Sequence, residues 1–341
     1  MSKIPIKEDF WPDHRQELLL KAALLQGKES IMAWEEWKGG FTTGHNLEKG
    51  SLGLLPMLYK NLNAQGIKDP LLKVFNGIYR RTWYKNEILL RNAIPEILSS
   101  FDQAGIKVMV LQAAALVRYY RDSGLRSLED FDVLVPIEII DQAIQTLGRS
   151  GWQIAEGFMP ITKLTKYSDH SRRFVHSDHS LIMELHWYAF PERCCRSEDD
   201  DLWGSAIKVQ VANREVWALN ATDKLLYICA YGTRYSMRSS LYWVMDSFTL
   251  LKDHQGEIDW QRLLSQAKKR SLNLHLREAL NYLEDEFKAP IPEFVMKNIN
   301  SMKIPDEEMF HYKRNTQKPP FWELPFYTIL RGLRLMHRSL R

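Results

Sequence analysis

The sequence predicts an α+β protein, in which a small mixed sheet with helices is flanked by N- and C-terminal helical regions. Three observations predict this class. Apolar residues recur at helical spacing through 1–92, short aliphatic runs alternate with helical segments through 93–212, and helical spacing returns through 213–305. Residues 306–341 then form a proline-punctuated tail that ends in a basic amphipathic helix candidate.

The N-terminal region is expected to be helical. Asp13 can cap a helix that runs over 17–25 and stops near Gly27, because its carboxylate can accept from the N–H groups of the first turn. Residues 71–98 form a longer periodic stretch, which predicts a broken helix or two helices. Shorter helices are expected at 31–37 and 52–62.

The central region is expected to alternate strands with helices and to end in a hairpin. Its apolar runs are short and are bounded by glycine or polar turn residues, as buried strands are. In chain order the predicted elements are a strand at 107–111, a helix at 112–120, a turn at 122–124, a strand at 130–136, a helix at 138–149, and hairpin strands at 172–177 and 180–187 that turn at Asp178-His179. A strand at 206–211 leads into the C-terminal helices.

The composition is that of an ordinary soluble globular protein, with 45% hydrophobic and 26% charged residues. A net charge of only +4 disfavours long nucleic acid as a partner, although a local basic patch is compatible with it. No stretch reaches the roughly 18 apolar residues of a membrane span, and the N-terminus lacks the apolar run of a signal peptide. We therefore expect a cytoplasmic protein without a transmembrane segment.

Two carboxylates stand two residues apart on the predicted strand 130–136. Asp130 and Asp132 therefore point to one face of the sheet, while Phe131 points to the opposite, buried face. Adjacent carboxylates repel each other unless a cation lies between them. A hard cation such as Mg²⁺ suits the position because it takes oxygen ligands and keeps room for phosphate oxygens.

A third carboxylate is available on the predicted strand 180–187, where Glu184 and His186 share one face. If this strand pairs antiparallel with 130–136, Glu184 joins the aspartates, and three carboxylates can hold two metal ions. An Asp-x-Asp pair alone is more often a solvated strand face or a turn. The buried opposite face and the third carboxylate favour a metal site here.

Histidines and cysteines offer two other candidate sites. Four histidines fall in one short region (His170, His176, His179 and His186), which invites a zinc hypothesis. Two of them flank the predicted turn and no cysteine has ligand spacing with them, so a solvated turn with one site histidine, His186, is favoured. Among the cysteines, Cys194 and Cys195 are adjacent and flanked by arginines that could lower a thiol pKa, but no histidine partner for a nucleophile is visible. A structural role is favoured for them.

The tail 325–341 carries four arginines beside an apolar face. Docking on the chain's own core is the commonest outcome for such a helix. An anionic membrane surface, RNA or a partner protein are the alternatives.

Several segments together share the pattern of a known family. The most specific is Arg126-x-x-x-Asp130-x-Asp132, followed at a distance by Glu184-Leu-His-Trp. The segments 111–116, 54–59, 224–231, 242–250 and 258–260 fit the same pattern. On these segments, most of residues 30–300 resembles the uncharacterised nucleotidyltransferase family within the DNA polymerase β-like superfamily.

The resemblance implies a polymerase-β-type palm that moves a nucleotidyl group from an NTP to an acceptor and releases pyrophosphate. Asp130 and Asp132 would bind Mg²⁺ or Mn²⁺ together with the nucleotide, and Glu184 would complete the site. Arg126 would steady the triphosphate or pair with a site carboxylate, although capping a loop is an equally ordinary role. The implied nucleotide contacts are Gln112, Ala113, Arg126, Ser127, His186 and Lys224. The favoured acceptor is a small molecule or a peptide or protein side chain.

The chain departs from the family pattern before the aspartates. The family usually has Leu-Lys-Gly where this chain has Leu111-Gln112-Ala113, so a charge and a close backbone approach are both replaced. This change supports an alternative, a nucleotide-binding or scaffold protein with weakened catalysis. A tail-directed RNA or membrane interaction protein is a second alternative.

Overall fold

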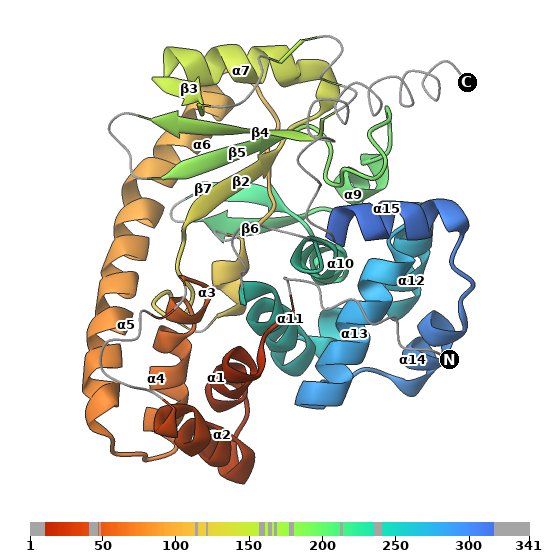
Figure 1. Ribbon diagram of the computed structural model, residues 1–341. Coiled ribbons are helices and arrows are strands. Elements are labelled where there is room, and N and C mark those ends of the chain that lie inside the picture. Colours follow the sequence, from red (N-terminus) through yellow and green to blue (C-terminus); the bar gives the residue numbers. More distant parts are fainter. Residues whose placement is uncertain are drawn as a thin grey trace. The chain divides into compact units, whose positions relative to one another are not determined.

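The computed structural model describes residues 11–40, 47, 49–112, 115–120, 122–156, 161–162, 166, 169–176, 181–211, 214–234 and 241–316 (Figure 1). The chain divides into two compact units. Within the described residues, the helical unit contains 11–83, 122–126 and 225–316, and the sheet unit contains 84–120 and 127–224. The α+β class is confirmed. The N- and C-terminal helices, expected as separate regions, belong to one unit.

The helical unit begins with helices that the sequence predicts well. The elements are α1 (His14–Leu24), α2 (Gly27–Gly39), α3 (Lys49–Leu52), α4 (Leu55–Ala64) and the first part of α5 (Pro70–Ile88). Asp13 caps α1 as predicted: its carboxylate accepts from the Gln16 N–H at 2.8 Å, and its own N–H donates to the Gln16 side chain at 3.0 Å. The reciprocal bonds satisfy two donors that a bare helix end leaves without partners.

The rest of the helical unit comes from the C-terminal part of the chain. Its elements are α10 (Ala221–Gly232, which starts in the sheet unit), α11 (Tyr242–Asp253), η4 (Gln255–Glu257), α12 (Trp260–Lys269), α13 (Asn273–Phe287), α14 (Glu293–Ser301) and α15 (Asp306–Thr316). Buried Glu308 of α15 accepts from the Leu274 N–H at 2.7 Å and from the Asn273 amide at 2.9 Å, which ties the start of the predicted tail to α13. The basic helix candidate 325–341 lies outside the described residues.

The long helical stretch at 71–98 is broken, as the sequence predicts. α5 ends at Ile88, a π-helical turn η1 covers Leu89–Ala93, and α6 covers Ile94–Gln103. Pro95 explains the position of the break, because it has no N–H to give to a carbonyl in the preceding turn. No helix in the described part of the chain is long and apolar enough to cross a membrane.

Seven strands in the described residues form one mixed sheet, in the order β3-β4-β5-β2-β1-β7-β6. The strands are β1 (Met109–Val110), β2 (Asp130–Leu134), β3 (Trp152–Ile154), β4 (Ser171–His176), β5 (Ile182–His186), β6 (Ile207–Val211) and β7 (Arg214–Ala218). The predicted hairpin is present, because β4 and β5 pair antiparallel. Its turn at Asp178-His179 lies outside the described residues.

Two expectations about this region are wrong. β5 pairs with β2 in parallel, not antiparallel. After β2 the chain returns through α7 (Ile140–Arg149), and because β3–β4 and β4–β5 are both antiparallel pairs, β5 runs in the same direction as β3 and β2. The helix expected at 112–120 is a short 3₁₀ turn, η2, over Leu116–Tyr119. A second 3₁₀ turn, η3 (Ile137–Ile139), opens the helix expected at 138–149.

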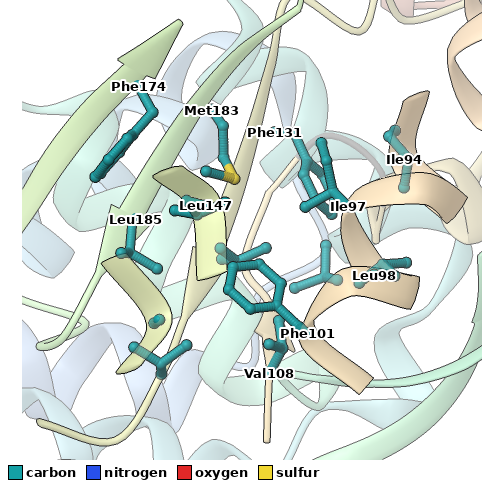
Figure 2. Close-up of a cluster of buried hydrophobic side chains, with 14 of the residues drawn as sticks. Ile94, Ile97, Leu98, Phe101, Val108, Phe131, Leu147, Phe174, Met183 and Leu185 are labelled. Atoms are coloured by element: carbon teal, nitrogen blue, oxygen red, sulfur yellow. The ribbon is translucent and has the colours of Figure 1, made fainter. Parts of the chain in front are cut away.

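One face of the sheet is packed into the core of the sheet unit. Phe131, Met183, Leu185 and Phe174 meet helix residues that include Ile97, Leu98 and Phe101 of α6 and Leu147 of α7 (Figure 2). Each of these side chains is at most 5% exposed. Because side chains alternate along a strand, the neighbours of Phe131 and Met183 must point to the other face.

The turn at 122–124 is held by Asp122. Partial burial raises the pKa of this carboxyl, but hydrogen bonds from Tyr79 (2.6 Å) and from the Gly124 N–H (2.9 Å), together with the Lys60 ammonium, more than offset it and lower the pKa overall. The carboxylate form is therefore favoured by folding.

We expect Asp122→Asn to lower the free energy of unfolding at neutral pH by about 1 kcal/mol, after allowance for solvent screening. A lowered folded-state pKa stabilises the protein above the unfolded pKa of about 3.9, and this contribution is lost as the pH falls through the folded-state pKa. Urea denaturation at several pH values should thus show that the free energies of unfolding of the variant and the wild type converge as the pH falls. A difference that stays constant with pH would contradict this role.

Candidate functional site

The candidate site starts from the register between β2 and β5. Asp132 lies opposite Glu184, and Asp130 lies opposite Ile182. Paired positions on neighbouring strands project to the same face, so the three carboxylates share a face although the pairing is parallel. The opposite positions, Phe131 and Met183, are fully buried in the core. The face that carries the carboxylates is therefore the one not filled by this core.

The two aspartates differ in their surroundings. Asp132 is only 5% exposed, and its backbone carbonyl accepts from the Leu111 N–H at 3.0 Å. Asp130 is partly exposed at the start of β2. The chain that enters β2 is fixed by Asn86, whose fully buried side chain accepts from the Leu128 N–H at 3.0 Å. The backbone on both sides of Phe131 is thus held by hydrogen bonds, at Leu128 by the Asn86 side chain and at Asp132 by the Leu111 N–H.

Glu184 is oriented by its neighbours on β4. The Ser171 hydroxyl donates to Glu184 Oε1 at 2.6 Å. The Arg173 guanidinium lies 3.8 Å from Oε2, and Arg173 is the β4 residue paired with Glu184. Glu184 keeps 28% of its side chain exposed, so solvent and ions can reach it. Neither Ser171 nor Arg173 is singled out by the sequence pattern.

A second group gathers around Glu184. One ligand atom each from His170, Glu184 and His186 lies within 4.8 Å of the other two. Within the described part of the chain, this is the group in which three possible metal ligands lie this close together. The carboxylates of Asp130, Asp132 and Glu184 do not form such a group. Sequence reasoning favoured His186 alone. The crowding of four histidines was the signal that could have included His170.

Arg126 takes a role that the sequence left open. Its guanidinium contacts both carboxylate oxygens of Asp246, with Nη2–Oδ2 3.3 Å and Nε–Oδ1 3.4 Å, and lies 4.1 Å from the Tyr242 ring centre. Arg126 is 5% exposed and Asp246 is 3% exposed. The arginine thus pairs with the carboxylate of Asp246, a residue that is not among the three predicted for the site. Ser127, the next residue, is partly buried.

Lys224 is fully buried and its ammonium donates to the Leu111 carbonyl oxygen. The bond lies directly before Gln112, which is partly buried, while Ala113 lies outside the described residues. A lysine in this position holds the end of β1 by a charge-assisted hydrogen bond. It does not present its charge at the surface of the sheet unit.

Cys195 and Cys229 do not have the properties of nucleophiles. Burial and a hydrogen bond to Glu198 raise the pKa of Cys195 to about 11, although Arg193 acts in the opposite direction. Burial raises the pKa of Cys229 to about 12. Thiols with such pKa values carry almost no thiolate at neutral pH.

A family model described as an uncharacterised nucleotidyltransferase matches residues 51–288. A search of curated proteins gave no match. The chain is similar to a crystal structure of an antigenic nucleotidyltransferase-like protein from Paracoccidioides brasiliensis, with 14% identity and a TM-score of 0.38. That match covers 65% of this chain and 96% of the other.

Proposed function

Because the chain belongs to the uncharacterised nucleotidyltransferase family, we propose that it is a metal-dependent enzyme that transfers a nucleotidyl group from an NTP to an acceptor and releases pyrophosphate. The observation that supports this most is the pairing of Asp132 with Glu184 on the sheet face that also carries Asp130. Three carboxylates on one side of two neighbouring strands are a donor set for hard cations.

By donor chemistry the carboxylates suit Mg²⁺ or Mn²⁺, which Asp130, Asp132 and Glu184 would hold. When bound, such an ion offsets the negative charge that develops on phosphate oxygens during transfer. The protein's own part is to fix the donors in place. Asp132 is positioned by the Leu111 N–H, which donates to its backbone carbonyl, and Glu184 is oriented by the Ser171 hydroxyl, which donates to Oε1.

The nucleotide would be held by groups around these carboxylates. We propose that the Gln112 amide donates to phosphate oxygens and that Ser127 and His186 line the nucleotide. Lys224 would act as a positioning residue, since its ammonium is used on the Leu111 carbonyl. Arg126 would likewise be a positioning residue, since its guanidinium pairs with Asp246.

We expect Gln112→Lys to tighten NTP binding. The new charge stands where the related family pattern has lysine, and an ion pair near a partly exposed surface contributes about 1 kcal/mol, which is roughly fivefold in Kd. Calorimetric titration with Mg²⁺-ATP measures the change. Gln103→Lys adds the same charge at an exposed position of α6 and serves as the matched control. Equal tightening in both variants would show a general charge effect and contradict the role of Gln112.

The reaction itself is tested by pyrophosphate release. Each of the four NTPs is incubated with Mg²⁺ or Mn²⁺ and with small-molecule or peptide acceptors. We expect release by the wild type and by Asp141→Asn, which removes a 71% exposed carboxylate, and none by Asp130→Asn with Asp132→Asn. Release that survives in the double variant would overturn the assignment of the site.

One alternative has a specific observation in its favour. Gln112 brings no charge to the phosphate-binding segment, which suits a protein that binds nucleotide without turning it over. Metal-dependent NTP binding that needs Asp130 and Asp132, without pyrophosphate release under any condition, would support this alternative.

A further inference from the structure

We infer that His170, Glu184 and His186 form a second metal site, which takes a transition-metal cation such as Zn²⁺. The three residues come from the paired ends of β4 and β5, next to the proposed carboxylate centre. This inference concerns metal binding and does not require nucleotidyl transfer. Glu184 is common to both sets of ligands, so the two sites must be distinguished by the remaining residues.

The backbone fixes where the three side chains start. The Trp187 and Tyr188 N–H groups both donate to the His170 carbonyl, at 2.9 Å and 3.2 Å, which extends the β4–β5 pairing by one step beyond the strands. Within the hairpin, Ser171 lies opposite His186. His170 therefore stays beside the end of β5, and its position does not depend on the turn at the other end of the hairpin.

The distances are close to those of a metal site. The two imidazole ring centres are 5.7 Å apart at an angle of 58°, and the ligand atoms of all three residues lie within 4.8 Å of one another. Ligands of a tetrahedral Zn²⁺ ion, with bonds of about 2.0–2.2 Å, are about 3.4 Å apart. Side-chain rotations that bring each pair together by at most about 1.4 Å would complete the geometry.

The donor set selects the kind of cation. Two imidazoles and one carboxylate suit Zn²⁺ and its neighbours in the transition series, whereas Mg²⁺ takes oxygen ligands almost alone. Three protein ligands also leave a coordination position for water or another small ligand. The aspartates of β2 supply only oxygen, so the two neighbouring sites differ in the cations they prefer.

The surroundings support the ligands in the way that metal sites commonly do. The Ser171 hydroxyl donates to Glu184 Oε1 at 2.6 Å and also lies 3.4 Å from His170 Nε2. His186 is only 1% exposed, so its ring is fixed by packing. Arg173 competes for Glu184 Oε2 from 3.8 Å, but its side chain is 43% exposed and can turn into solvent when a cation binds.

The test is Co²⁺ binding to the full-length protein, followed by visible absorption and by competition with Zn²⁺. We expect the wild type to bind one Co²⁺ at this site with intense bands of four-coordinate Co²⁺, and His170→Ala to bind it at least about tenfold more weakly. Asp130→Asn with Asp132→Asn should keep the absorption. His14→Ala removes a histidine whose side chain is 78% exposed and should behave as the wild type.

His186→Gln is a second variant for the same Co²⁺ titration. Because His186 is buried, the melting transition of this variant is first compared with that of the wild type. Co²⁺ binding that is unchanged in His170→Ala would overturn the inference. Loss of the Co²⁺ bands in the Asp130 and Asp132 double variant, to the same degree as in His170→Ala, would overturn it as well, because the ion would then belong to the carboxylate centre. Failure of the proposed transferase function would show as absent pyrophosphate release and would leave these Co²⁺ results unaffected.

Discussion

Asp130→Asn combined with Asp132→Asn is expected to remove Mg²⁺-dependent NTP binding and to lower the rate of transfer by at least about a thousandfold. Metal ions at such sites supply several kcal/mol of charge stabilisation, and about 4 kcal/mol corresponds to this factor. The substitution keeps the shape of each side chain and removes only its charge. Because Asp132 is 5% exposed beside Glu184, the double variant should fold normally and melt no lower than the wild type in the absence of metal.

Thermal denaturation with Mg²⁺ alone, with ATP alone and with both measures this prediction. The wild type should gain stability when both are present, and the double variant should not. Asp141→Asn, an exposed carboxylate of α7, is the control for a general loss of negative charge. Equal metal-dependent stabilisation of the double variant and the wild type would contradict the assignment of the metal ligands.

Asp246→Ala is expected to lower the free energy of unfolding by about 3–5 kcal/mol. The substitution leaves the Arg126 guanidinium, whose side chain is 6% exposed, without the carboxylate that balances its charge. A buried charge without its partner is costly, while the net contribution of the intact pair is small. The Tyr242 ring, 4.1 Å from the guanidinium carbon, offsets only part of that cost.

Urea denaturation of Asp246→Ala is compared with that of the double variant Arg126→Met plus Asp246→Leu. The comparison separates the cost of a buried charge without its partner from the net contribution of the intact pair. The double substitution removes both charges and should recover most of the lost stability, because apolar side chains of similar volume can replace a buried pair. Glu293→Ala breaks an exposed ion pair with Lys297 and should change stability little. A loss below about 1 kcal/mol in Asp246→Ala would contradict the view that this pair is buried in solution.

The sequence predicted the local part of the candidate site because strand alternation is a local property. The spacing of Asp130 and Asp132 around Phe131 is sufficient to separate a core face from a polar face. The cap at Asp13 was equally predictable, since it depends on hydrogen bonds within one turn of helix, and the length of the stretch 71–98 predicted that it is broken.

The parts that could not be predicted depend on pairing at a distance. Whether β5 runs parallel or antiparallel to β2 is decided by the segment between them, which contains β3. β3 has only three residues and β7 is mostly partly exposed, so neither strand has a clear sequence pattern. Asp246, the partner of Arg126, is 120 residues away in the sequence, on α11. The resemblance implies that Lys224 contacts the nucleotide, whereas the structure buries it with its ammonium on the Leu111 carbonyl.

The most direct measurement of the central claim follows radioactive phosphate from the nucleotide to an acceptor. The protein is incubated with Mg²⁺ or Mn²⁺ and with each NTP labelled on either the α- or the γ-phosphate. A nucleotidyltransferase moves the α-label to the acceptor and releases the γ-label as pyrophosphate, and both changes should be absent when Asp130 and Asp132 are asparagines. Transfer of the γ-label to the acceptor, or transfer of the α-label by the double variant, would contradict the account.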